Sequence, residues 1–315
     1  MIDAIKYLCP WELRRTESFI IPKGPSFSKA PIKYCQIGGC DVSFKLPKWK
    51  NDKLHNQLGP KFGDWESLPM NDQLYPGWTS SIMMYVVWKF IGPWFTGQAA
   101  IVNASITLQK PRKANNTASF FHPVAFEQAV TQLKAFQLCP EKYTTSKYEY
   151  TAPVNWRPLD LPVPAVYFET IPVDNSGYRH EECWLAVNDD LLVNFSFRID
   201  QAYPGDNTEV DKKIDRQPMK DLVLQVVNSL NVSLSPELQT KIDSIKENNP
   251  NIAISETCAP LDLKSYESEL AKAIKDDEKA KQDELDRRAK QPDNIAAEII
   301  RRVKENPELL KSKNQ

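Results

Sequence analysis

The strongest constraint on the fold is a period-two pattern in residues 182–199, ECWLAVNDDLLVNFSFRI. Apolar side chains occupy every second position of its second half, at Leu191, Val193, Phe195, Phe197 and Ile199. This is the period of a β-strand with one buried face. The Asn-Asp-Asp triplet at 188–190 separates this strand from a preceding apolar one. The pattern therefore predicts an antiparallel β-hairpin.

A second hairpin is predicted around residues 75–100, YPGWTSSIMMYVVWKFIGPWFTGQAA. A membrane-spanning helix needs about 20 consecutive apolar residues, whereas Lys89 and Pro93 interrupt this stretch. The β-branched and aromatic content favours a strand over residues 81–91, followed by a turn and a second strand that ends near Lys110. We therefore expect a buried hairpin and no transmembrane span.

Three tryptophans belong to this region: Trp78, Trp88 and Trp94. Two interpretations are open for them. They form an aromatic cluster that reaches the surface, where such side chains anchor protein interfaces, or they pack in the core of the sheet.

Two amphipathic helices are expected to cover the strands. After His122-Pro123, residues 123–138 place apolar side chains on one helical face, and residues 218–230 carry an apolar stripe with the same period. Helices combined with mainly antiparallel, twisted strands define the α+β class. We therefore expect sheets that are covered by these two helices.

The body is expected to span residues 1–235, as one unit or as two β-rich halves at 17–115 and 116–235. Residues 236–315 form a charged helical C-terminal extension, in which Pro292 is expected to interrupt the helix. This extension carries too few apolar residues to fold alone. We therefore expect its last helix to dock on the body, on another chain or on a partner protein, and a solvated helical arm is the alternative interpretation.

Composition argues against several classes of function. The 315 residues carry a formal net charge of −1, which gives no support to nucleic-acid binding. The six cysteines are widely spaced and no secretory signal is recognisable, so we expect free thiols and a cytoplasmic location. The spacing of the cysteines and of the three histidines predicts no zinc site, and no phosphate-cradling glycine motif is present. We expect neither a metal nor a cofactor.

The strongest catalytic candidate is GYRHEEC, residues 177–183, which contains both His180 and Cys183. A cysteine nucleophile needs an imidazole close to its sulfur atom. In a strand, residues three apart point to opposite faces, so the local geometry disfavours this pair. A polar turn that leads into the hairpin is the alternative interpretation.

The block from His122 to Ser235 resembles PsbP-like α+β domains, through the order of AVYFETIPV, the ECWLAVNDDLLVNFSFRI hairpin, the amphipathic helix and NSLNVSL. Small bacterial chaperones and accessory proteins of toxin secretion systems resemble the same pattern. PWELRRTESFIIPKG and PWFTG are similar to segments of proteobacterial proteins encoded near type VI secretion effectors. This resemblance implies an immunity or effector-handling protein that works by binding.

Three hypotheses follow for function. The first is a non-enzymatic protein that binds a partner protein, such as a cognate toxin, through Trp78, Trp88, Trp94, Ile299, Arg301 and Arg302. The second is a hydrolase with an unrecognised site around His180 and Cys183. The third is a structural homo-oligomer that assembles through the C-terminal helices.

Overall fold

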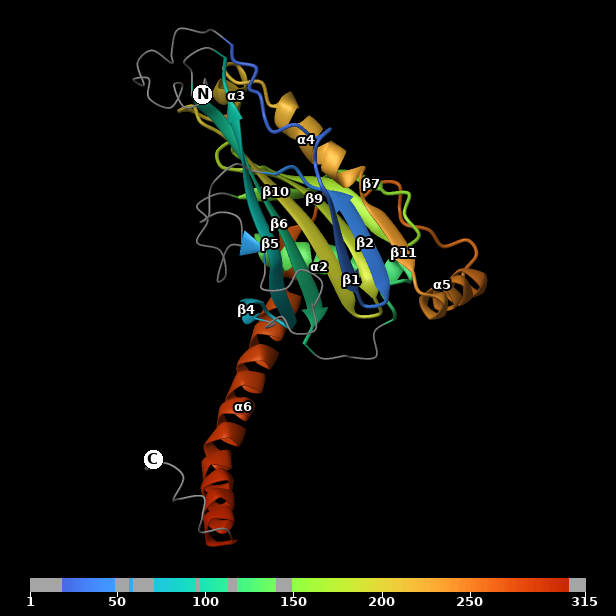
Figure 1. Cartoon of the computed structure of the whole chain (residues 1–315), viewed down its shortest axis with the longest axis vertical. Helices are drawn as coiled ribbons and strands as arrows, with labels where there is room; N and C mark the ends of the chain where they lie inside the picture. Colours follow the sequence, from blue (N-terminus) through green and yellow to red (C-terminus); the bar gives the residue numbers. More distant parts are fainter. Residues whose placement is uncertain are drawn as a thin grey trace. The chain divides into compact units, whose positions relative to one another are not determined.

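A computed structural model describes residues 19–48, 57–58, 71–93, 97–112, 118–139 and 149–305. These residues form two antiparallel sheets and several helices, which confirms the expected α+β class (Figure 1). Residues 1–266 and residues 267–315 form two separate compact units.

The larger sheet has eight strands in the order β3-β5-β6-β10-β9-β8-β7, with β4 also paired to β5. The strands are β3 (Gln57–Leu58), β4 (Asn71–Tyr75), β5 (Trp78–Ile91), β6 (Gln98–Pro111), β7 (Tyr150–Pro158), β8 (Ala165–Pro172), β9 (Arg179–Asn188) and β10 (Leu191–Gln201). The pairs β5–β6 and β9–β10 are the two predicted hairpins. Because β6 also pairs with β10, the larger sheet contains strands from both halves of the body.

The small sheet has the order β1-β2-β11, from β1 (Ile32–Ile37), β2 (Cys40–Lys45) and β11 (Asn231–Leu234). The two-residue turn between β1 and β2 is Gly38-Gly39, with φ of 60° and 88°. Positive φ at both central positions is the requirement of a tight hairpin turn, and glycine meets it without steric cost. A Cβ on Gly38 would also lie 2.7 Å from the carbonyl oxygen of Val187, so this turn packs directly on the larger sheet.

The small sheet packs face to face on the larger one. Phe44 of β2 meets Phe195 of β10 edge to face, with 5.1 Å between ring centroids. Alternate residues of β1 and β2 are buried in this interface, while those between them are exposed. The buried side supplies a large part of the apolar core, since burial of each large apolar side chain contributes about 1.5–3 kcal/mol.

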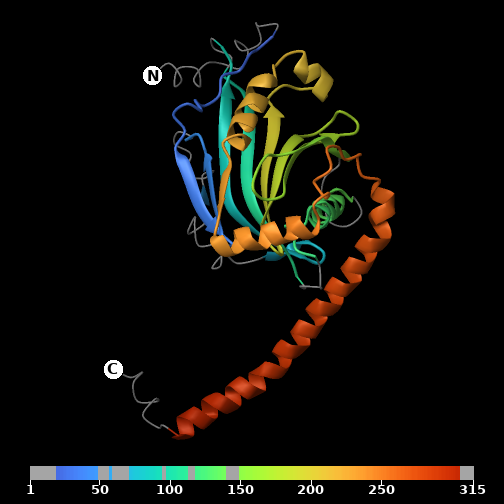
Figure 2. The same cartoon turned by 90° about the vertical axis from the view of Figure 1, so that its right-hand side faces the viewer.

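Helices cover the remaining faces of the larger sheet. Helix α2 (Pro123–Leu138) and the small sheet lie on opposite sides of the larger sheet (Figure 2). Helix α4 (Gln217–Val227) buries the predicted apolar stripe on the same side as the small sheet, and the short α3 (Asn207–Asp211) precedes it. The bounds of α2 match the prediction, and those of α4 differ from it by a few residues.

The β7 edge of the larger sheet is covered by the chain itself. The proline-containing β7 is the last strand of the sheet, which is where proline is tolerated because its missing N–H leaves no gap in the ladder. Residues 249–262 run beside it. The amide of Leu261 donates to the carbonyl of Ala152 at 2.8 Å, and the indole of Trp156 donates to the carbonyl of Ser255 at 2.9 Å.

The C-terminal residues are helical. Helix α5 (Pro236–Asn248) begins at Ser235, whose hydroxyl accepts from the amide of Leu238. Helix α6 (Leu263–Glu305) is continuous, so the expected interruption at Pro292 is wrong. Proline removes one backbone hydrogen bond and crowds the preceding turn, and here it is accommodated between segments rich in lysine, glutamate, arginine and alanine, which are good helix formers. No helix of the described residues is long and apolar enough to cross a bilayer.

Candidate functional site

The outer face of the small sheet is the candidate interaction surface. It consists of the side chains that point away from the larger sheet: Ile32, Tyr34, Gln36, Asp41, Ser43, Lys45, Asn231 and Ser233. Tyr34 is 68% exposed and Ile32 is 48% exposed. A strand whose inner side fills the core normally places polar residues on its outer side. The two large side chains at these positions are therefore the feature that requires an explanation.

A groove of ≈ 380 Å³ lies on this surface and draws its lining from all three strands. Its walls are formed by Tyr34, Cys35, Gln36, Asp41, Val42, Ser43, Asn231 and Ser233. The hydroxyl, amide and carboxylate groups can hydrogen-bond a ligand, while the ring of Tyr34 offers apolar area at little conformational cost. This combination suits recognition of a protein segment.

The two cysteines of the small sheet offer no thiol chemistry. Burial, with the negative charge of Asp41 adding to it, raises the pKa of both Cys35 and Cys40 to about 12. The thiolate is the reactive form of cysteine, so both thiols stay protonated and unreactive near neutral pH.

Two of the predicted interface tryptophans lie in the core. Trp88 has no exposed surface, stacks on Phe197 and donates its indole N–H to the carbonyl of Pro47 at 3.2 Å. Trp78 is 5% exposed and stacks on Phe120. The surface-cluster interpretation is therefore wrong for these two, and the core interpretation holds. The reason is that both rings point to faces of the larger sheet that other elements cover.

Four further residues were predicted to contact a partner. Trp94 lies outside the described residues, and Ile299, Arg301 and Arg302 belong to α6 at positions whose side chains are not described. Partner contacts through these four residues stay predictions.

His180 and Cys183 do not form a nucleophile–base pair. They lie three residues apart on β9 and point to opposite faces of the sheet, as the sequence indicated. Cys183 is fully buried, and this burial raises the pKa of its thiol. Burial also lowers the pKa of His180 to about 4, with the positive charges of Lys134 and Arg198 acting in the same direction. Neither group is poised for acid–base work near pH 7.

A buried carboxylate pair lies under α4. Glu169 and Glu181 are cross-strand partners on β8 and β9, and Lys220 of α4 lies 2.9 Å from Glu169 Oε1 and 3.7 Å from Glu181 Oε1. Burial raises the pKa of Glu181 although the hydroxyl of Tyr167 donates to it. Burial acts the same way on Glu169, but hydrogen bonds from Lys220 and Asn155 hold its pKa below the usual value.

Two carboxyl groups with opposite pKa shifts can serve as a catalytic acid and base. Here the geometry favours a structural role. Glu181 is 1% exposed and Glu169 is 6% exposed, so a substrate has no access to either. The ionic contacts instead fix the orientation of α4 on the sheet.

A second buried ion pair lies on the opposite face, under α2. Lys134 of α2 pairs with Glu182 of β9, and both are almost fully buried. Glu182 also accepts from the hydroxyl of Thr170 at 3.0 Å and from the indole of Trp184 at 3.1 Å. Burial alone would raise the pKa of Glu182, but the Lys134 ammonium holds it below its usual value.

In the described part of the chain, no group of three His, Cys, Asp or Glu side chains could hold a metal ion.

The sequence did not single out the outer face. In IKYCQI both sides of β1 carry a large apolar residue, so its period gives no sign of which side faces solvent.

Comparison with known proteins adds no constraint, because no family model, curated protein or solved structure matches this chain.

Proposed function

We propose that this protein works by binding a partner protein on the outer face of its small sheet. The observation that carries the proposal is the exposure of Tyr34 and Ile32 beside the groove. Exposed aromatic and aliphatic side chains next to hydrogen-bonding groups are typical of protein interfaces, whose energy is concentrated in a few such anchors.

The class of partner is proposed from the resemblance of residues 122–235 to accessory and immunity proteins of toxin secretion systems. On that basis the partner is a toxin or effector, and this protein holds or neutralises it without catalysis. The burial of the titratable clusters under α2 and α4 supports binding over turnover, because neither cluster is open to a substrate.

A crosslinking experiment in the native host tests the proposal. The tagged protein is compared with an Ile32→Asp/Tyr34→Asp variant, and the captured protein is identified by mass spectrometry. We expect a single partner, encoded beside this gene, whose capture falls at least about tenfold in the variant, since each lost interface anchor costs about 2 kcal/mol or more.

The matched control is Val173→Asp, because Val173 is 58% exposed and lies outside the small sheet. This variant should capture the partner as well as the unmodified protein does. Capture that is equal in all three proteins, or no captured partner at all, would refute the proposed function.

A further inference from the structure

The free edge of β1 presents hydrogen-bonding groups in a regular array. The turn at Gly38-Gly39 makes Ile37 and Cys40 a hydrogen-bonded pair, and such pairs alternate along an antiparallel ladder. The amide of Leu46 donates to the carbonyl of Pro31, so these two residues are also bonded to each other, as the alternation requires. The N–H and C=O groups of the three residues in between, Ile32, Tyr34 and Gln36, therefore point away from β2.

These edge groups have no partner in the described part of the chain. β1 ends the order β1-β2-β11, and no backbone or side-chain hydrogen bond reaches Ile32, Tyr34 or Gln36 from any described residue outside the small sheet. The register of β1 is also regular, without the bulge that often protects an edge. Lys33 is the only charged side chain on β1, and an edge without a bulge is a template for an extended chain that can accommodate this charge.

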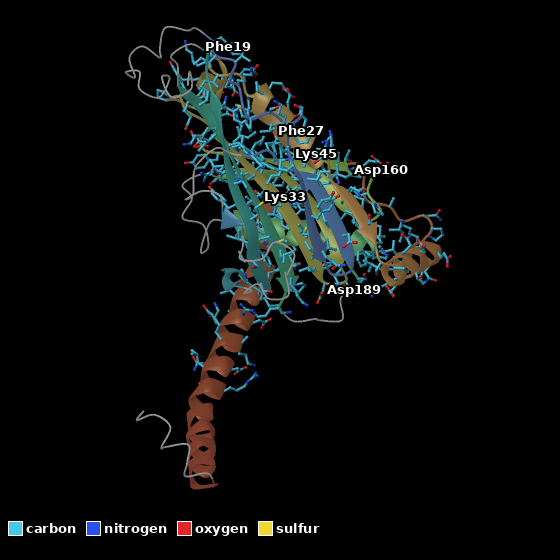
Figure 3. All side chains as sticks on the ribbon, viewed as in Figure 1. Phe19, Phe27, Lys33, Lys45, Asp160 and Asp189 are labelled. Atoms are coloured by element: carbon cyan, nitrogen blue, oxygen red, sulfur yellow. The ribbon has the colours of Figure 1, made fainter. Side chains whose placement is uncertain are left out.

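Charge argues for a partner segment rather than a second copy. Lys33 and Lys45 lie on the small sheet (Figure 3), and neither makes an ion pair with any described residue. Antiparallel pairing of two β1 strands centred on Tyr34 would place Lys33 diagonally from its own copy, at about 7–8 Å. Like charges at that separation disfavour self-pairing, whereas a carboxylate on a foreign strand would neutralise Lys33.

We propose that β1 accepts an extended segment of a partner protein as an added strand of the small sheet, and that this segment carries a carboxylate side chain beside Lys33. This inference rests on the proposed function and specifies its mode of binding. The segment would hydrogen-bond the edge groups of Tyr34 and Gln36, and its side chains would lie against the ring of Tyr34.

A backbone substitution separates strand addition from contact with side chains alone. Gln36→Pro removes the N–H that points to the free edge and leaves the β1–β2 ladder intact, because that N–H is not part of it. Gln36→Ala is the matched control, since it shortens the side chain and keeps the N–H. Thermal unfolding of both variants verifies that they fold.

The probe is a phage-displayed library of random peptides of about ten residues, a length that covers a typical strand. We expect enriched peptides with alternating apolar positions and at least one acidic residue. Their affinity should fall about tenfold on Gln36→Pro and on Lys33→Glu, and stay within about twofold on Gln36→Ala.

Each other outcome overturns the inference. Equal binding to Gln36→Pro and Gln36→Ala would show docking through side chains only. No enrichment would show that the edge accepts no peptide strand. A dimer by light scattering that dissociates in Gln36→Pro would make a second copy the occupant. Loss of the captured partner in Ile32→Asp/Tyr34→Asp, with full capture by Gln36→Pro, would refute strand addition and leave the proposed function standing.

Discussion

The ion pair between Lys134 and Glu182 allows the most direct test of how α2 is held on the sheet. The change is Lys134→Met, which keeps most of the length of the side chain and removes its charge. Glu182 would keep its hydrogen bonds from Thr170 and Trp184 but would lose its only counter-charge among the described residues. Removal of one partner from a buried pair costs about 3–5 kcal/mol.

This cost predicts a large shift in the midpoint of thermal unfolding. For a unit the size of this body, each kcal/mol shifts the midpoint by about 2–4 °C, so we expect a decrease of roughly 6–20 °C. The measurement is circular dichroism during heating, supported by urea denaturation. Addition of Glu182→Gln should recover most of the loss, since two uncharged side chains leave no buried charge without a partner.

The effect should depend on pH with a defined sign. In the native protein the pKa of Glu182 is lowered, so its stabilising contribution is present above the unfolded pKa of about 4.3 and is lost as the pH falls through the folded value. In Lys134→Met, burial without the ammonium raises that pKa. The folded variant then holds a proton that the unfolded chain releases, so its stability decreases as the pH rises from about 4.3 towards 7.

An exposed pair provides the control. Lys110 and Asp190 lie 3.0 Å apart with side chains 42% and 26% exposed, so Lys110→Met should cost less than about 1 kcal/mol. A Lys134→Met variant no less stable than Lys110→Met, or one whose stability does not change between pH 5 and pH 7, would refute the argument that this buried charge depends on its partner.

Three further predictions follow from burial and helix length. Trp88→Ala should lower the free energy of unfolding by about 3–5 kcal/mol in urea denaturation, because it empties a fully buried site; a loss below about 1 kcal/mol would contradict the core assignment. Among the five cysteines of the described residues, brief alkylation of the native protein near pH 8 should modify Cys258 first and Cys183 last by mass spectrometry, because Cys258 is partly exposed whereas Cys183 is fully buried with a raised pKa; early modification of Cys183 would show that β9 opens readily. If the C-terminal helices drive oligomerisation, light scattering should detect an oligomer of the full chain that becomes monomeric when the chain ends at Glu278, and an unchanged mass would exclude that mode of assembly.

Local sequence patterns were sufficient for the elements whose two sides differ strongly. The hairpin of β9 and β10 and the helices α2 and α4 were predicted because apolar residues recur with the strand or helix period. The break expected at Pro292 is wrong, because a proline can be accommodated within a helix when good helix formers flank it on both sides.

The sequence by itself determined the two hairpins, the helices α2 and α4, the α+β class, and the opposite orientations of His180 and Cys183, because each follows from the spacing of side chains along one element. Only the tertiary structure decided that Trp78 and Trp88 are buried while Tyr34 and Ile32 are exposed. That outcome depends on which faces of the two sheets meet, and the pairing of β6 with β10 and of β2 with β11 brings together residues that are far apart in the chain. A local period shows that a strand has two sides, and only the packing partner decides which of them water reaches.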